Sequence, residues 1–397
     1  MSTTGPSLVD LSPAVQVALV GALVAMLPLA WSAWRLWREG GTAAWRDRSA
    51  WQRTLTVVTL FLTIDLVVFG AFTRLTDSGL GCPDWPGCYG SASPLGAHGE
   101  ISEAQAQAPT GPVTHGKAWI EMIHRYLAAG VGALITLLMA LAWQRTDPHG
   151  PSPGLSRWWP TWTFVWVCVQ GAFGALTVTL KLYPLVVTGH LLGGLIGVGL
   201  LSAQVRAAGA SSSWTPEPLG HGARVAAVGV LGVWTLQALL GAWVSTNHAV
   251  LACAEFPTCQ GRWWPDMDWS QGFTMLRALG ADGQGGYIAL PALTAIHMAH
   301  RLGAVLAVLA VLALAWHCHR IGAGRAARGL LALIGLQVIT GLSNVVLGWP
   351  LVAALGHTLG AALMVGWLTT LAVVPVTRSR VVQGAPGFIS RWATSHG

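Results

Sequence analysis

The sequence predicts an all-α polytopic membrane protein: two pseudo-symmetric four-helix bundles plus one extra N-terminal transmembrane helix, nine spans in all. Three observations support this fold class. Only 9% of the 397 residues are charged, whereas about 25% is usual in soluble domains. The mean hydropathy is +0.56, and the apolar residues form long runs. Distinctive motifs also recur in the two halves of the chain. This composition excludes a soluble enzyme.

Each spanning helix needs about 20 mostly apolar residues. The first candidate, 14–34, is expected to be an uncleaved span, because residues 1–34 contain no Lys or Arg and so lack the basic start of a signal peptide. Eight further segments have the required length and composition: 55–73, 119–143, 159–180, 184–205, 223–244, 292–316, 327–347 and 351–375.

The arginines predict the orientation. A predicted loop, 35–54, carries five of them, and ten more lie on the same side: Arg145, Arg157, Arg206, Arg224, Arg320, Arg325, Arg328, Arg378, Arg380 and Arg391. Fifteen of the 22 cations therefore share one side, which the positive-inside rule assigns to the cytoplasm. We expect a bacterial inner-membrane protein with a periplasmic N-terminus and a cytoplasmic C-terminus. The net charge of +7 is thus a topology signal, and no nucleic-acid partner is expected.

The chain contains an internal repeat. Segment 70–90 aligns with 241–261 without a gap, which places Cys82 over Cys253 and Cys88 over Cys259. The run EMIHR at 121–125 aligns with HMAHR at 297–301, and His190 aligns with His357 within one residue. A repeat that keeps chemically special residues in order indicates a duplicated unit. We therefore expect an N-terminal helix with a basic loop at 1–51, repeats at 52–210 and 223–377, a linker at 211–222 and a tail at 378–397.

Four histidines lie at one depth in the predicted spans. His124 and His190 belong to the first repeat, and His300 and His357 to the second. A histidine inside a membrane span is costly and indicates function. At about 1.5 Å per residue, all four lie roughly 9–12 Å below the outer surface. Two imidazoles on different helices of one bundle predict axial ligation of a heme in each half.

Other interpretations of the histidines remain open. They could be hydrogen-bonded between helices without a ligand. Zinc is disfavoured, because no carboxylate or thiolate accompanies each pair at ligand spacing. His297 lies three residues before His300 on the same helical face and is a lower-ranked alternative ligand.

Two carboxylates lie in or beside the spans. Glu121 is one helical turn from His124 and is replaced by His297 in the second repeat. A buried carboxylate in this position could transfer protons, or it could form a salt bridge with Arg125 or Arg74. Asp65 lies mid-span and has Leu236 as its counterpart. It could belong to a proton path or make a buried hydrogen bond.

The cysteines form two outer C-x5-C loops, Cys82 with Cys88 and Cys253 with Cys259. Disulfides persist in an oxidising compartment, so structural disulfides are expected, with redox-active thiols as the alternative. Cys168 is mid-span and is expected to be buried. Three arginines near the outer helix ends, Arg74, Arg125 and Arg301, could pair with heme propionates or simply extend to the interface.

These residues resemble the heme A synthase family. The resemblance is carried by FGAFTRLTDSGLGCPDWPGC, EMIHR, the helix of His190, the second C-x5-C loop, HMAHR and His357, and it covers about residues 52–375. It implies eight helices in two bundles. It also implies oxidation of the C8 methyl group of heme O to a formyl group by successive hydroxylations, which gives heme A for terminal oxidases. The helix at 14–34 is additional to this pattern.

The same resemblance implies residue roles. His124 and His190 would flank the substrate heme O, and His300 and His357 would ligate the iron of a heme b cofactor. Glu121 matches a glutamate implicated in catalysis. Cys82 and Cys88 match a loop pair implicated in redox delivery or transfer. The implied partners are heme O, heme A, membrane lipid, a heme O synthase and cytochrome oxidase assembly factors.

Two other function classes need the same features. A non-catalytic di-heme b-type electron carrier or quinol-linked cytochrome would use the four histidines and give Glu121 no chemistry. A membrane thiol oxidoreductase or heme transporter would use the outer cysteine loops.

Overall fold

The computed structural model describes residues 12–144, 156–209 and 215–374. Within these ranges the secondary structure is helical, and nine helices are long and apolar enough to cross a membrane. The predicted all-α class and the nine spans are confirmed. The spanning helices are α1 (Ser12–Arg46), α2 (Arg48–Leu75), α4 (His115–Trp143), α5 (Trp158–Thr179), α6 (Pro184–Ala207), α7 (His221–Thr246), α9 (Leu290–Arg320), α10 (Gly324–Val346) and α11 (Leu351–Ala372).

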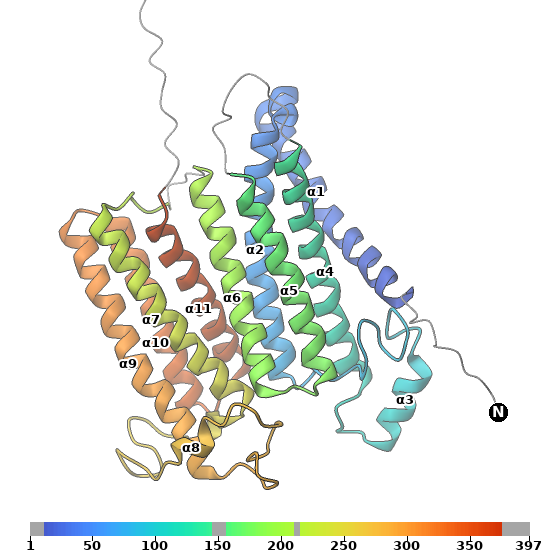
Figure 1. Ribbon diagram of the computed structural model, residues 1–397, viewed down its shortest axis with the longest axis vertical. Helices are drawn as coiled ribbons and strands as arrows, with labels where there is room; N and C mark the ends of the chain where they lie inside the picture. The colour runs from blue at the N-terminus through green and yellow to red at the C-terminus, as the bar shows by residue number, and fades with distance from the viewer. Residues whose placement is uncertain (1–11, 145–155, 210–214, 375–397) are drawn as a thin grey trace, which may run out of the picture.

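Eight of these helices pack as two closed rings (Figure 1). In the first ring α2 contacts α4, α4 contacts α5, α5 contacts α6, and α6 returns to α2. In the second ring the order is α7, α9, α10, α11 and back to α7. The rings meet where α6 packs against α7 and α11 and where α2 packs against α11. A ring of four helices places the side chains of diagonal helices opposite one another.

The additional helix α1 lies outside the first ring, against α4 and α2. Small residues allow this close approach. A Cβ built on Gly21 would lie 2.4 Å from Ala129 Cβ and 2.9 Å from the backbone nitrogen of Gly130. Close backbone packing through small residues is the usual way that helices associate in lipid. A larger side chain at Gly21 would therefore push α1 off α4.

The expected basic loop at 35–54 is wrong, because most of it is helical. The α1 helix continues to Arg46 across a kink at Gly41, whose φ is 58°. Asp47 then accepts a hydrogen bond from the backbone nitrogen of Ser49 at 2.8 Å and caps α2. Charged residues end an apolar run but need not end a helix, since Arg and Glu are good helix formers. The expected boundary at residue 51 thus lies inside α2.

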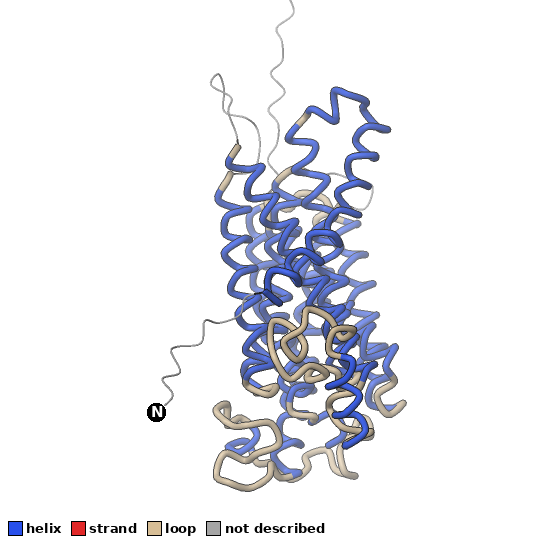
Figure 2. The backbone as a smooth tube through the Cα atoms, turned by 90° about the vertical axis from the view of Figure 1, so that its right-hand side faces the viewer, coloured by secondary structure: helices blue, strands red, loops and turns tan. Residues whose placement is uncertain are grey.

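The long connections gather at one end of the helices (Figures 1 and 2). The first, between α2 and α4, contains the short helix α3 (His98–Gln107). The second, between α7 and α9, contains a 3₁₀ turn η1 (Ala249–Ala252) and α8 (Trp269–Gly272). Some predictions fall on residues that the structure does not describe: the tail 378–397, the first four residues (211–214) of the linker 211–222, and Arg145, Arg378, Arg380 and Arg391. Residues 145–155, 210–214 and 375–397 lie outside the described residues.

Candidate heme sites and the outer disulfide loops

The four histidines occupy diagonal helices of the two rings. His124 is on α4 and His190 on α6, and these helices do not neighbour each other in the first ring. His300 on α9 and His357 on α11 have the same relation in the second ring. The imidazoles of each pair are close enough for their charges to interact. Each ring therefore carries two imidazoles on helices that lie diagonally across it.

Each histidine packs against a glycine of a neighbouring helix. A Cβ built on that glycine would lie within 3.3 Å of the histidine Cε1 in all four places. The pairs are Gly70 with His124 at 3.1 Å, Gly174 with His190 at 3.3 Å, Gly241 with His300 at 2.9 Å and Gly341 with His357 at 3.2 Å. The glycines leave room for an imidazole between closely packed helices. The four positions thus share one local design.

Three of the four imidazoles have a side-chain partner at Nδ1. The amide nitrogen of Gln170 lies 3.1 Å from His190 Nδ1, and that of Gln237 lies 2.9 Å from His300 Nδ1. The same nitrogen donates to the backbone carbonyl of the histidine, so the amide meets Nδ1 as a donor and Nδ1 is the acceptor. These contacts hold the two rings at Nδ1.

The partner of His357 is a hydroxyl. Thr340 Oγ1 lies 3.0 Å from His357 Nδ1 and donates to the carbonyl of Leu336 at 2.7 Å. Because its proton is used there, the hydroxyl accepts from Nδ1–H. His124 Nδ1, in contrast, is buried and has no hydrogen-bond partner.

His297 is held away from this pattern. It is 3% exposed, and its Nδ1 lies 3.0 Å from the carbonyl oxygen of Ala249, in η1. Among the described residues no group of three or more His, Cys, Asp and Glu side chains could hold a metal ion. The contact of His297 with Ala249 thus connects α9 to η1 in the second outer loop.

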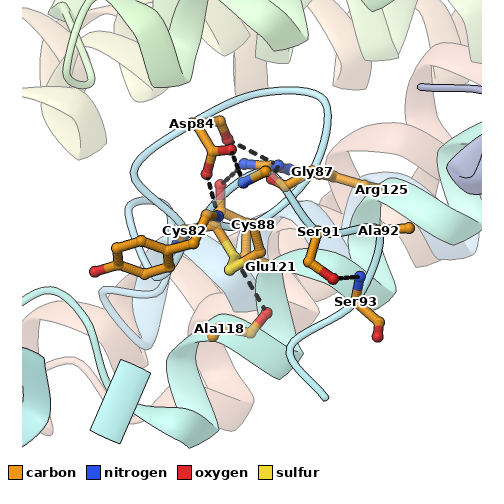
Figure 3. Close-up of a disulfide and its surroundings, with 12 residues drawn as sticks. Cys82, Asp84, Gly87, Cys88, Ser91, Ala92, Ser93, Ala118, Glu121 and Arg125 are labelled. Atoms are coloured by element: carbon orange, nitrogen blue, oxygen red, sulfur yellow. Dashed lines mark hydrogen bonds and ion pairs between the residues drawn. A yellow bond between two sulfur atoms is a disulfide. The ribbon is translucent and has the colours of Figure 1, made fainter. Parts of the chain in front are cut away.

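Glu121 is 4% exposed and points its carboxylate at the first outer loop (Figure 3). Its Oε2 accepts a hydrogen bond from the backbone nitrogen of Cys82 at 2.8 Å. Its Oε1 accepts from Arg125 Nη2 at 2.5 Å, and both side chains of this ion pair are largely buried. The structure therefore contains the salt bridge with Arg125, one of the two interpretations left open by the sequence. Arg74 does not take part.

Cys82 and Cys88 are joined by a disulfide, with their Cα atoms 4.9 Å apart. Arg125 Nη1 donates to the carbonyl oxygens of Asp84 at 3.0 Å and Pro86 at 3.2 Å, and also to that of Gly87. The disulfide loop is thus fastened to α4 by a guanidinium and a carboxylate that are themselves paired (Figure 3).

The second loop is built in a similar way. Cys253 and Cys259 are joined by a disulfide with the same Cα separation of 4.9 Å. Arg301 donates to the carbonyl oxygens of Glu255 at 2.7 Å, Thr258 at 3.0 Å and Cys253 at 3.3 Å. In both loops the arginine that directly follows His124 or His300 therefore contacts the loop backbone.

Arg74 joins the two halves. From the end of α2 its Nη2 donates to the carbonyl oxygen of Ser245 at 2.8 Å and lies 2.8 Å from His248 Nε2. Ser245 is the counterpart of Arg74 in the repeat, 171 residues later. This contact ties the outer end of the first ring to the second.

Two mid-span residues differ from expectation. Asp65 is exposed on the surface of α2, so it is not the buried hydrogen-bonding residue that the sequence allowed. Cys168 is exposed on α5, and the expectation that it is buried was wrong. Hydrophobicity alone does not tell the lipid-facing side of a spanning helix from its packed side.

The sequence reasoning missed the residues that support the histidines. The sequence did not identify Gln170, Gln237, Thr340 and the four glycines as neighbours of the imidazoles. The available signal was a fixed spacing. A glutamine precedes the glycine by four residues in Gln170–Gly174, Gln237–Gly241 and Gln337–Gly341.

The chain has clear relatives. A family model described as cytochrome oxidase assembly protein, COX15-CtaA, matches residues 53–369. A protein named heme A synthase from Shewanella oneidensis is 37% identical over 79% of this chain and 93% of its own length. Proteins of the same name from Sphingopyxis alaskensis and Shouchella clausii are 31% and 27% identical, over 53% and 54% of this chain and 63% and 66% of their own lengths.

The family match covers nearly all of both rings and begins after the end of α1 at Arg46, which agrees with α1 being additional to the matched unit. With nine apolar helices, the chain is a multi-pass membrane protein. It belongs to the COX15-CtaA family of cytochrome oxidase assembly proteins, the heme A synthase family to which its motifs pointed.

Proposed function

We propose that this protein is a heme A synthase: it oxidises the C8 methyl group of heme O to a formyl group and supplies heme A for terminal oxidases. One observation carries the proposal beyond the family match. Each ring holds two imidazoles on diagonal helices, but within the described part of the chain a buried carboxylate lies one helical turn from such a histidine in the first ring alone, at Glu121. An enzyme that binds one heme as substrate and another as cofactor needs such an unequal pair of sites.

The donor sets fit these two roles. His300 is oriented by Gln237, and His357 by Thr340, to which its Nδ1–H donates, so Nε2 is the nitrogen of each ring that would bind iron. We assign them to heme b, which when bound supplies one-electron redox chemistry. His124 and His190 in the first ring are assigned to heme O.

Glu121 is proposed to hold and move a proton beside the substrate. Its carboxylate is shielded from water, and Arg125 and the backbone nitrogen of Cys82 fix its orientation. Oxidation of a methyl group releases protons, and a buried carboxylate close to the reacting carbon can accept them. The link to Cys82 would also make the orientation of Glu121 depend on the Cys82–Cys88 loop, which is the role we propose for this cysteine pair.

The arginines Arg74, Arg125 and Arg301 are proposed as propionate partners, in addition to their loop contacts. A guanidinium has five N–H donors, so backbone contacts do not exhaust it. Arg301 Nε is buried without a partner. A propionate at the outer end of α9 would supply an acceptor for it.

We also propose that the outer loops face the periplasm of a bacterial inner membrane. The arginine-rich helix ends lie at the opposite end from the two disulfides, as the positive-inside rule requires. In this orientation a heme O synthase would deliver the substrate through the membrane, and assembly factors of cytochrome oxidase would accept heme A.

The test is extraction and chromatography of hemes from cells that express this protein together with a heme O synthase. Heme A is expected from the unaltered protein. The Glu121→Gln variant keeps an acceptor for the backbone nitrogen of Cys82 but removes the charge, and should lower heme A at least 100-fold on the scale of general acid–base catalysis. His297→Gln, at the matching position in the other ring, is the control and should retain heme A.

Persistence of heme O with no heme A in the unaltered protein would overturn the proposal. A second function is supported if the unaltered protein and Glu121→Gln both bind heme and neither forms heme A. The ion pair of Glu121 with Arg125 would then be structural. The two bis-imidazole sites would belong to a membrane electron carrier.

A further inference from the structure

The three histidines whose Nδ1 has a side-chain partner, His190, His300 and His357, share a second feature. Gln170, Gln237 and Gln337 each pass their amide over the helix of the histidine, where a glycine stands three residues after it. A Cβ on that glycine would collide with the amide: 2.0 Å at Gly193, 2.4 Å at Gly303 and 2.3 Å at Gly360. The glutamine and the glycine therefore form one structural unit, because a side chain in place of the glycine would displace the glutamine amide.

In each unit the glutamine also donates to the backbone carbonyl of its histidine. The distances are 2.6 Å for Gln170 to His190, 3.1 Å for Gln237 to His300 and 2.8 Å for Gln337 to His357. The amide thus bridges two helices at the depth of the imidazole. Together with the contacts to Nδ1, it prevents the imidazole from turning.

His124 lacks this unit at both positions. Leu66 stands four residues before Gly70, where the other helices have glutamine, and Leu127 stands three residues after His124, where they have glycine. His124 Nδ1 is consequently buried without a hydrogen bond. The ring is held by packing alone, with Phe69 stacked at a centroid distance of 6.1 Å and an interplanar angle of 8°.

This difference has a chemical consequence. A partner at the second ring nitrogen fixes the orientation of a ligating imidazole, and loss of such an outer partner typically weakens metal binding 10–100-fold. We propose that His124 is the exchangeable axial ligand of this protein, able to leave the iron of the first site and open a coordination position to a small exogenous ligand, whereas His190, His300 and His357 are locked. The inference rests on the proposed assignment of a heme to each ring.

Carbon monoxide binding to the dithionite-reduced, heme-loaded protein in detergent tests this directly, since carbon monoxide binds a ferrous heme only where an axial position opens. We expect binding at one of the two hemes. The double variant Leu66→Gln/Leu127→Gly installs the missing unit at His124 and should weaken carbon monoxide binding at that heme about 10–100-fold.

The reciprocal variant serves as the matched control. Gln237→Leu removes the amide from His300 and leaves Gly303 in place, so carbon monoxide should now bind at the second heme as well. Combining all three substitutions should move carbon monoxide from the first heme to the second. Heme content and the oxidised absorption spectrum report whether each variant has folded and loaded.

Unchanged carbon monoxide binding in loaded Leu66→Gln/Leu127→Gly protein would overturn the inference, as would binding at both hemes of the unaltered protein. Neither result depends on turnover. Failure to make heme A with the expected carbon monoxide pattern would instead count against the proposed function alone.

Discussion

The two outer disulfide loops are built alike but fastened differently. Each is held by the arginine that follows a histidine, Arg125 or Arg301, through three backbone carbonyls. In the first loop that arginine is also paired with Glu121, which binds the loop backbone at Cys82. In the second, the equivalent of Glu121 is His297, which is bonded to the carbonyl of Ala249 instead.

The comparison shows which contacts the two loops share and which they do not. The contact of arginine with the loop needs only carbonyl oxygens and is kept in both halves. The carboxylate of Glu121, which links the first loop to a buried ion pair, is replaced by the imidazole of His297 beside the second loop. The same half has the histidine whose Nδ1 is unpaired. Both departures from the repeat lie on α4, three residues apart, which is where we place the substrate.

The largest difference between the halves should appear when the arginines are removed. Arg125→Gln leaves the carboxylate of Glu121 buried without its partner, and breaking a buried pair costs about 3–5 kcal/mol. Arg301→Gln loses contacts to neutral carbonyls, at a cost of about 1–3 kcal/mol. Thermal unfolding in detergent should show a larger fall in Tm for Arg125→Gln.

A double variant sharpens this result. Arg125→Gln/Glu121→Gln removes both charges and should recover part of the lost stability, because no isolated charge stays buried. Equal falls in Tm for the two single variants would show that Glu121 is not stabilised by Arg125.

The disulfides should be closer to equal. Both loops join cysteines six residues apart, and closing a loop of this length stabilises by about 2–3 kcal/mol in the chain-entropy account. Cys82→Ser/Cys88→Ser and Cys253→Ser/Cys259→Ser should therefore lower the free energy of unfolding by similar amounts. Heme A yield should fall further in the first pair, because only that loop touches Glu121. A larger loss of yield in the second pair would reverse the proposed roles of the two loops.

Much of this arrangement could be predicted from the sequence. The apolar runs gave the nine helices, and the alignment of His124 with His300 and of Cys82 with Cys253 located the repeated features. The helices were predictable from local hydropathy patterns, and the repeated features from residue types that are rare in a membrane. The continuation of α1 to Arg46 was missed, because a hydropathy pattern marks the apolar part of a helix rather than its end.

The partners of the buried groups could not be predicted in the same way. Whether Glu121 faces a heme or Arg125 depends on side-chain rotation within one helical turn. The contact of Arg74 with Ser245 depends on how the rings meet. The glutamine and glycine spacing was visible in the sequence, but its meaning required the neighbouring helices, since Gln237 and His300 are 63 residues apart.

On the opposite, arginine-rich side the two halves are joined by Glu217. Its carboxylate accepts from the backbone nitrogens of Arg325 and Ala326, both at 3.1 Å, and from Arg325 Nε at 3.1 Å. Burial alone would raise the pKa of Glu217, but these hydrogen bonds lower it to about 2. This tie therefore contributes stability above pH 4.5, and the contribution is lost as the pH falls toward 2.

Glu217→Gln should cost about 1 kcal/mol at neutral pH, comparable to the loss of a helix cap. The cost should shrink below pH 4, because Glu217 then takes up a proton in the unfolded chain while the folded protein, with its lower pKa, keeps the carboxylate ionised. Unfolding measured from pH 7 to pH 3 checks this. A cost that stays constant over that range would show that the charge of Glu217 contributes nothing to the tie.

The outer tie between the halves should respond at a different pH and with the smallest effect. Burial, followed by the charge of Arg74, lowers the pKa of His248, against an opposing effect of Asp77. A histidine with a lowered pKa stabilises the folded state when neutral, so its contribution is complete above pH 6.5 and declines as the pH falls through the folded value. His248 is exposed on the outer surface, so salt should weaken this pH dependence.

His248→Asn should remove the pH dependence while leaving the contact of Arg74 with Ser245. Tm measured between pH 7.5 and pH 5 should then fall less in the variant than in the unaltered protein, and an equal fall in both would place the acid sensitivity of the contact between the rings elsewhere.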